Sequence, residues 1–530
     1  MRKSGEHGIL ILTSIFFLIF FGISLNFFRL STEQEHVQTA RESSFITIHA
    51  GDSFGTIYDR NFKPLVNEKT KIVAVVLPSA VELTEIEEIA EDKEEASEKY
   101  AEGKPFAFRC RKKGTESAGL TFFEIPERYS GNVIAPHTIG YISENSGASG
   151  LEYAFDMLLR TGNTENSVTY PTDGFGHILI GGEKTVIRSE KTESGVVTTL
   201  DSEIQSICEK AGSNIEKGAV IVSDVKNGEI LALASFPEYD VTDISDSLDD
   251  ENSPMINRAL YSYSVGSIFK LITAAEGINE GFSGYISECT GECDIIGQIF
   301  RCHDADGHGV QDMTSAIVHS CNPYFISLSR CFDIKSYRSF AYSMGFGREI
   351  HLCAGMISSA GVLPSAKELL VPAELANFSF GQGKLTATPL QINQMTCAIA
   401  NGGNLIMPRI VRGITVDGKT VGNEKSQLRS KVMTAETAAE LRKMMIAAIY
   451  ENESSNAAPD YVRAAAKTST AQTGRFDEDD EELCHSWITG FFPASSPRYA
   501  VTVLVEDGGY GNDSAAPVFR DIVNMMCQRK

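Results

Sequence analysis

The most constraining feature of the chain is an apolar segment near its start. Residues 8–28 read GILILTSIFFLIFFGISLNFF and carry no charge. A helix of roughly 20 apolar residues crosses a bilayer core. Arg2 and Lys3 precede the segment and favour a cytoplasmic N-terminus. We therefore expect residues 1–7 to form a cytoplasmic tail and residues 8–28 a single transmembrane anchor. The rest of the chain would then lie outside the cytoplasm.

Two other interpretations fit this segment less well. A cleaved signal peptide would have a shorter apolar region followed by a small-residue cleavage site, whereas RLSTE follows here. A buried core helix is disfavoured because a terminal helix that is apolar all round has little to pack against. The segment therefore indicates an uncleaved anchor.

The remaining composition is that of an acidic globular protein. Hydrophobic residues make up 42% and charged residues 22% of the 530 residues, which excludes a disordered, collagenous or polytopic membrane protein. The net charge of −23 argues against nucleic acid as a partner, because such binding needs cationic side chains at the phosphates. The 11 cysteines are scattered and odd in number, which does not indicate a disulfide framework.

The pattern of the chain changes near residue 195. We expect residues 29–190 to form one domain of mixed composition. Within it, residues 83–103 are rich in Glu and Lys with apolar residues at a helical spacing, which predicts one exposed amphipathic helix.

Residues 195–530 have the pattern of a second, α+β domain. β-branched runs flank Asn227-Gly228, and two further runs flank ASSPR near the C-terminus, so each pair predicts a hairpin. Mostly helical patterns separate the two hairpins, and a helix with Pro517 near its start closes the chain. This order predicts an antiparallel sheet built from sequence-distant strands and covered by helices.

The first motif with chemical meaning is Ser267-x-x-Lys270, at the start of an apolar helical pattern. Residues three apart share a helix face, so the spacing places a hydroxyl beside an amine. Serine needs a base to become nucleophilic, and lysine acts as a base only when burial or a nearby cation keeps it neutral. Taken alone, the pair is far more typical of a surface helix start with a capping serine than of a catalytic site.

Two later segments supply matching chemistry. Ser320-Cys321-Asn322 offers a hydroxyl that could relay a proton and an amide that could hold a substrate amide. Lys467 begins the run KTST, which indicates a strand edge carrying a cation and hydroxyls. Each segment alone has an ordinary structural explanation, as a turn and as a polar strand.

Together, Ser-x-x-Lys, Ser-x-Asn and Lys-Thr-x in this order form a known signature, and the chain resembles a class B penicillin-binding protein, a peptidoglycan D,D-transpeptidase. GTIYDRNFKPL at 55–65 is similar to the family's N-terminal signature, and residues 138–162 to its Gly-Leu-Glu segment. The blocks NRALYSYSVGSIFK, SFGQGKLTATPLQI and KTSTAQTG are similar to its transpeptidase blocks. The resemblance implies a transmembrane helix, an elongated pedestal or dimerisation-type domain over 29–190, and a transpeptidase domain over 195–530.

The resemblance also implies roles for single residues. Ser267 would attack the carbonyl of the penultimate D-alanine of a stem peptide, and an amine from a second stem would then resolve the acyl-enzyme. Lys270 would act as the base, and Ser320 would pass the proton onward. Asn322 would hold the donor-strand amide. Lys467 would lower the proton affinity of Lys270 and attract the substrate carboxylate.

The strand after Lys467 would bind the substrate. Thr468 and Thr470 would contact the terminal carboxylate, and the backbone N–H groups of Ser267 and Thr470 would form the oxyanion hole. Ser469 stands where the family usually has glycine, and we expect a side chain there to narrow the cleft or change the preference for inhibitors. β-Lactams should acylate Ser267 by the same route.

A cysteine and histidine cluster leaves several interpretations open. Cys289, Cys293, Cys302, His303 and His308 lie close together in the sequence, with Asp304 and Asp306 between the two histidines. Zinc is conceivable from the ligand types, but the spacings do not match a standard knuckle. A disulfide and free thiols in a loop are the alternatives. We expect no metal or cofactor, and we interpret Cys321 as a packing residue.

Other functions on the same fold stay open as alternatives. A D,D-carboxypeptidase or a β-lactamase would resolve the acyl-enzyme with water, and a non-catalytic cell-wall scaffold would not need Ser267. The resemblance implies stem peptides and β-lactams as ligands, the membrane as an anchor, and a polytopic glycosyltransferase as a partner.

Overall fold

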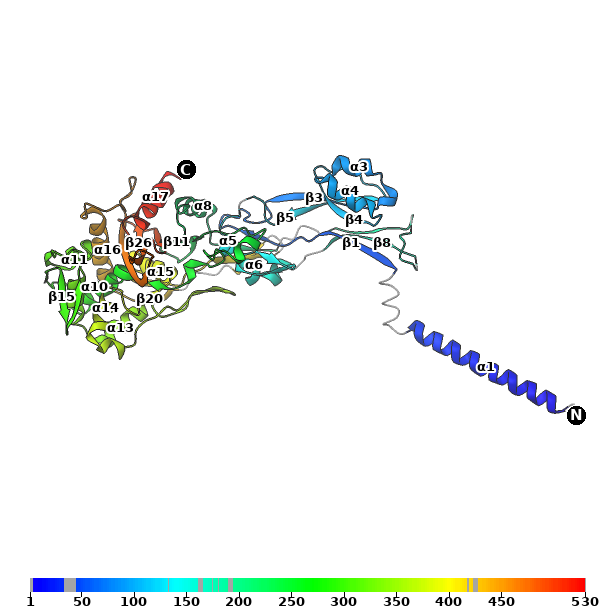
Figure 1. The fold of residues 1–530 in the computed structure, drawn as a ribbon, viewed down its shortest axis with the longest axis horizontal. Helices are drawn as coiled ribbons and strands as arrows, with labels where there is room; N and C mark the ends of the chain where they lie inside the picture. Colours follow the sequence, from blue (N-terminus) through cyan, green and yellow to red (C-terminus); the bar gives the residue numbers. More distant parts are fainter. Residues whose placement is uncertain are drawn as a thin grey trace. The chain divides into compact units, whose positions relative to one another are not determined.

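The computed structural model describes residues 3–32, 44–131, 133–160, 165–173, 175–179, 181–188, 194–416, 419–422 and 428–529. The chain divides into two compact units (Figure 1). The first unit comprises Met1–Phe54, Lys69–Glu127 and Gly162–Thr192. The second comprises Gly55–Glu68, Arg128–Thr161 and Glu193–Lys530. Two segments that precede residue 190 therefore belong to the second unit.

The first unit contains the apolar helix and two small sheets. In α1, the segment Leu10–Arg29 has a mean hydropathy of 2.3 and is long and apolar enough to cross a membrane. The sheets have the antiparallel orders β1-β8-β9 and β4-β3-β5. The elements are α1 (Lys3–Thr32), β1 (Phe45–Gly51), β3 (Lys69–Val76), α3 (Leu83–Ile89), α4 (Lys93–Ala101), β4 (Phe106–Cys110), β5 (Leu120–Glu127), β8 (Asn166–Pro171) and β9 (Thr185–Ile187).

The prediction of one helix over 83–103 is wrong, because the chain forms two helices there. Ala90 is extended and forms a β-bridge with Cys110 at the end of β4. Asp92 then caps α4 by accepting a hydrogen bond from the backbone N–H of Glu95. The bridge and the cap satisfy backbone groups that a continuous helix would use internally. Burial of Ala90 thus breaks the helix that the apolar spacing favours.

A five-stranded sheet forms the centre of the second unit. Its order is β12-β11-β27-β26-β25, and all neighbouring strands are antiparallel. This confirms both predicted hairpins and the sheet of sequence-distant strands. The strands are β11 (Gly218–Asp224), β12 (Ile230–Phe236), β25 (Ala465–Phe476), β26 (Glu482–Phe492) and β27 (Tyr499–Val505).

Helices cover both faces of this sheet (Figure 1). Side chains of alternate strand residues enter two separate cores, since successive residues of a strand point to opposite faces. Ile488 and Val503 pack with α8 and α17, whereas Trp487 and Leu504 pack with α10, α15 and α16. The helices are α8 (Ser202–Ala211), α10 (Lys270–Asn279), α11 (Met313–Val318), α12 (Asn322–Ser329), α13 (Ile334–Ser343), α14 (Pro372–Ser379), α15 (Pro389–Ala400), α16 (Ala435–Tyr450) and α17 (Ala515–Gln528).

Smaller strands surround this core. β2 runs parallel to β10 and thereby joins the segment 55–68 to the second unit. Short two-stranded sheets, β14-β17 and β15-β16, lie between α10 and α11 in the sequence. Their bounds are β2 (Thr56–Tyr58), β10 (Gly195–Thr198), β13 (Tyr263–Ser264), β14 (Ser287–Cys289), β15 (Glu292–Ile295), β16 (Gln298–Arg301), β17 (Gly309–Gln311), β20 (Thr386–Ala387), β22 (Val411–Val416) and β23 (Lys419–Val421).

Candidate active site

Ser267 lies in a 3₁₀ turn, Gly266–Phe269, that leads directly into α10. Gly266 has φ +63°, and a Cβ there would lie 2.4 Å from Ser469 Oγ, so the turn requires glycine. The Gly266 N–H donates to the Gly381 carbonyl oxygen at 2.8 Å. Ser267 itself is half-buried while Ile268 and Phe269 are buried. The turn is therefore fixed on two sides, with Ser267 near the positive end of the helix dipole.

Lys270 is completely buried and its amine is held by the second motif. Its Nζ lies 2.5 Å from the Ser320 carbonyl oxygen and 2.7 Å from Asn322 Oδ1. The same Nζ lies 3.2 Å from Ser320 Oγ. A buried amine with such fixed acceptors has one orientation, which suits directed proton transfer.

Two lysines of the site have lowered pKa values. Burial and, to a lesser extent, the positive charge of Lys467 together lower the pKa of Lys270 to about 7. Burial also lowers the pKa of Lys467 to about 8. At neutral pH a substantial fraction of Lys270 is thus uncharged, as a general base must be.

The second motif joins α11 to α12 through a turn. Ser320 has φ +51°, a conformation that costs energy for a residue other than glycine. Cys321 is the N-cap of α12, and Asn322 is its first residue. Asn322 Nδ2 donates to the Arg301 carbonyl oxygen at 3.0 Å, so both ends of this amide contact protein groups. The predicted contact of Asn322 with a substrate amide stays a prediction.

The third motif lies on β25, the edge strand of the sheet, as the sequence predicted. Lys467 and Ser469 are buried, and Thr468 and Thr470 between and after them are half-buried. This alternation follows the two faces of a strand. Thr470 Oγ1 accepts a hydrogen bond from the Gly511 N–H at 3.1 Å, which leaves its own proton available to an anion.

Ser469 is held inside the protein by a hydrogen bond. Its hydroxyl donates to the Val265 carbonyl oxygen at 2.8 Å, and the residue is 3% exposed. The side chain is therefore buried, and its effect on the cleft and on the preference for inhibitors stays a prediction. Its hydrogen bond joins the edge strand to the segment that precedes Ser267.

The structure thus brings the three motifs together. Lys270 contacts Ser320 and Asn322 directly, and its pKa responds to Lys467. Ser469 reaches the turn of Ser267 through Val265. The catalytic roles of these residues stay predictions.

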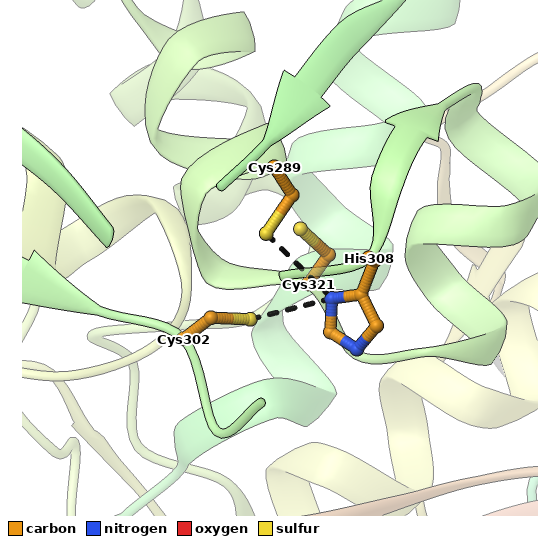
Figure 2. Close-up of side chains that lie close together, drawn as sticks. All are labelled: Cys289, Cys302, His308 and Cys321. Carbon is orange, nitrogen blue, oxygen red and sulfur yellow. Dashed lines mark hydrogen bonds between the residues drawn. The ribbon is translucent and has the colours of Figure 1, made fainter. Parts of the chain in front are cut away.

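The sequence does not reveal one cluster of potential metal ligands beside the second motif. The potential ligand atoms of Cys289, Cys302, His308 and Cys321 all lie within 4.8 Å of one another (Figure 2). Among the described residues, Cys293 and His303 fall outside this group. The sequence predicts a packing role for Cys321, which lies 13 residues after His308, and this separation gives no local signal of a shared site. All the cysteines are free thiols, so no disulfide joins Cys289 or Cys293 to Cys302 in the described structure.

Comparison with known proteins gives consistent matches. A model of the penicillin binding protein transpeptidase domain matches residues 218–524. Stage V sporulation protein D of Bacillus subtilis (strain 168) is 29% identical over 409 residues, covering 73% of this chain and 61% of that protein. Peptidoglycan D,D-transpeptidase MrdA of Acinetobacter baumannii is 28% identical over 409 residues, covering 70% of this chain and 60% of that protein. The chain therefore spans less than two thirds of the length of these relatives.

A solved structure matches at the level of the fold as well. The ceftriaxone acyl-enzyme complex of penicillin-binding protein A from M. tuberculosis superposes with a TM-score of 0.64 at 25% identity. The match covers 76% of this chain and 92% of that chain.

Proposed function

Since the chain belongs to the penicillin-binding protein transpeptidase family, we propose that it is a membrane-anchored peptidoglycan D,D-transpeptidase that cross-links stem peptides through an acyl-enzyme on Ser267. One observation carries the proposal, namely the buried Lys270 amine held by Ser320 and Asn322 one turn from Ser267. The names of its relatives and the acyl-enzyme form of a structural neighbour support it.

The contacts of Lys270 support its role as the base. A neutral amine has two N–H bonds and one lone pair. The Ser320 carbonyl oxygen and Asn322 Oδ1 can only accept, so they orient the two N–H bonds. The lone pair is then left to face the Ser320 hydroxyl, whose Oγ lies 3.2 Å from Nζ. Lys270 would take the Ser267 proton during attack, and Ser320 would carry it to the departing D-alanine amine.

The edge strand would bind the carbonyl and the carboxylate of the substrate. The backbone N–H groups of Ser267 and Thr470 would stabilise the oxyanion, at roughly 3–4 kcal/mol per donor. Lys467 is a cation at the site, and Thr470 keeps a hydroxyl proton for the substrate carboxylate because Gly511 supplies its own hydrogen bond. Thr468 would contact the same carboxylate. The acceptor amine of a second stem would then attack the acyl-enzyme and form the cross-link.

The apolar helix α1 would anchor the enzyme in the membrane, with the chain after residue 28 outside the cytoplasm. Its unburied, apolar segment Leu10–Arg29 supports this placement. A polytopic glycosyltransferase is the partner that the family resemblance implies, because new glycan strands must be made before they are cross-linked.

Labelling with a fluorescent penicillin tests the proposal. Membranes containing the wild-type chain should give a stable covalent adduct, and Ser267→Ala should abolish it. Ser283→Ala, at an exposed serine on the loop after α10, is the matched control and should label like wild type. Labelling of Ser267→Ala would contradict the assignment of the nucleophile. Rapid multiple turnover of the penicillin would instead indicate a β-lactamase.

A further inference from the structure

Four potential metal ligands lie close together at the second motif, Ser320-Cys321-Asn322, and one of them is Cys321 itself. Cys289 ends β14, Cys302 follows β16, His308 precedes β17, and Cys321 is the N-cap of α12. Figure 2 shows the three sulfur atoms and the imidazole directed toward one another. Ligands from four separate segments therefore converge on one point.

The distances fit a tetrahedral ion. Zinc binds sulfur at about 2.3 Å and nitrogen at about 2.0–2.1 Å, so tetrahedral sulfur and nitrogen ligands lie about 3.6 Å apart. His308 Nδ1 lies 3.7 Å from Cys289 Sγ and 3.5 Å from Cys302 Sγ. These separations leave room for an ion between the ligands.

The surroundings of the cluster also suit a metal. Cys289, Cys302 and Cys321 are 2%, 8% and 0% exposed, and the His308 side chain is 8% exposed. The other ring nitrogen, Nε2 of His308, lies 4.0 Å from Asp304 Oδ2. At 4.0 Å this carboxylate is too far for a hydrogen bond, but its negative charge favours a cation at the cluster.

We propose that Cys289, Cys302, His308 and Cys321 bind one zinc ion. Three thiolates and one imidazole in a closed, buried set are typical of structural zinc, which needs no open position for substrate. Each thiol would lose its proton on binding. The proposal differs from the expectation of no metal, which rested on sequence spacing without Cys321.

The ion would hold the second motif in its active geometry, an inference that rests on the proposed function. Cys321 lies between Ser320 and Asn322, which together hold the Lys270 amine. Cys302 follows Arg301, whose carbonyl oxygen accepts a hydrogen bond from Asn322. One ion bound to both cysteines would thus fix Asn322 from two sides and retain Ser320 at its positive φ. These four ligands are therefore positioning residues.

Metal content of the purified full-length chain tests the site directly. Wild type should hold about one zinc per chain, and Cys302→Ser should lose it. Cys293→Ser is the matched control, because Cys293 lies in the adjacent β15 but outside the cluster. Cys302→Asp, which keeps a ligand, should retain zinc more weakly. Cobalt loaded in place of zinc should give the absorption of a tetrahedral thiolate site. Wild type without zinc, or loss of zinc in Cys293→Ser alone, would overturn the assignment.

Zinc removal from the folded wild type tests the link to the active site. Chelation should slow penicillin acylation about 10-fold or more, and added zinc should restore it. If zinc is bound but its removal leaves acylation unchanged, the site stands and its positioning role fails. If the zinc-loaded chain forms no acyl-enzyme, the proposed function fails while the metal assignment stands.

Discussion

The chemistry proposed for Lys270 makes a prediction about pH. Its pKa is lowered to about 7, and only the neutral amine can accept the Ser267 proton. Penicillin acylation should therefore rise with pH up to about 7. Lys467, with its pKa lowered to about 8, loses its charge above that value and should then attract the ligand carboxylate less. The second-order acylation rate constant should give a bell-shaped profile with its maximum between these values, and a flat profile would contradict the assignment.

The variant Lys467→Met tests whether the charge of Lys467 influences the pKa of Lys270. The charge of Lys467 is the second cause of the lowered pKa of Lys270, after burial. Removing it should raise the pKa of Lys270 and move the acid limb of the profile to higher pH, with a lower maximum. Rate profiles of wild type and variant, measured with the same penicillin, make the comparison. An unmoved acid limb would mean that the two side chains are not coupled.

Gly266 and Ser469 form a pair that can be tested by stability. A Cβ at Gly266 would lie 2.4 Å from Ser469 Oγ at φ +63°. Gly266→Ala should cost more than about 1–2 kcal/mol, because it adds this clash to the strain of a left-handed residue. Adding Ser469→Gly should recover part of the loss, since it removes the clash but not the strain.

The sole tryptophan provides the measurement for this pair. Trp487 is fully buried on β26 of the central sheet, so its fluorescence reports unfolding of the second unit. Denaturant midpoints of the wild type, the two single variants and the double variant complete the cycle. Strictly additive effects would show that the two residues do not interact.

The buried carboxylate of Glu229, in the hairpin β11-β12, forms ion pairs with residues next to other strands. Glu229 is 2% exposed, and its oxygens lie 3.0 Å from Arg60 Nη2 and 2.6 Å from Arg409 Nη2. Arg60 follows β2, and Arg409 precedes β22. A single residue beside the Asn227-Gly228 turn therefore joins three segments that are distant in sequence.

Removing this charge should be costly. Glu229→Gln removes the buried charge that pairs with Arg60, Arg409 and Arg412, and we expect a loss of about 3 kcal/mol in unfolding free energy. Glu440→Gln is the control, because Glu440 and Lys443 form an exposed pair on α16 worth about 0.5 kcal/mol or less. Unfolding of both variants in denaturant, followed by Trp487 fluorescence, gives the two losses of unfolding free energy. Equal losses would show that the Glu229 network adds nothing beyond a surface pair.

The proposed anchor makes a prediction for all 530 residues of the chain. Leu18, Ile19 and Phe20 lie within the apolar segment Leu10–Arg29. The wild-type chain should stay in the membrane pellet after an alkaline wash and be released only by detergent. Replacing the three residues by arginine adds about 2.5–3.5 kcal/mol per residue to membrane insertion and should prevent it. Release of wild type by the wash alone would contradict a spanning helix.

Much of this architecture could be predicted because its signals are local. The uncharged run at 8–28 indicates a membrane helix, and the β-branched runs around Asn227-Gly228 indicate a hairpin, which the structure confirms. The three motifs could be grouped because their order matches the signature of the penicillin-binding protein family. The family resemblance therefore implies a common site for motifs that lie far apart in the sequence.

Tertiary packing decided the rest. Ala90 interrupts a helix because Cys110 of a neighbouring strand pairs with it, and Ser469 turns inward because Gly266 leaves space for its hydroxyl. Cys321 meets Cys289 and Cys302 only because α12 begins beside two small sheets. The segments 55–68 and 128–161 join the second unit across long stretches of chain. The spacing of hydrophobic residues and the chemistry of single side chains determine structure over a few neighbouring positions. The contacts named above depend instead on which surfaces, distant in the sequence, pack together.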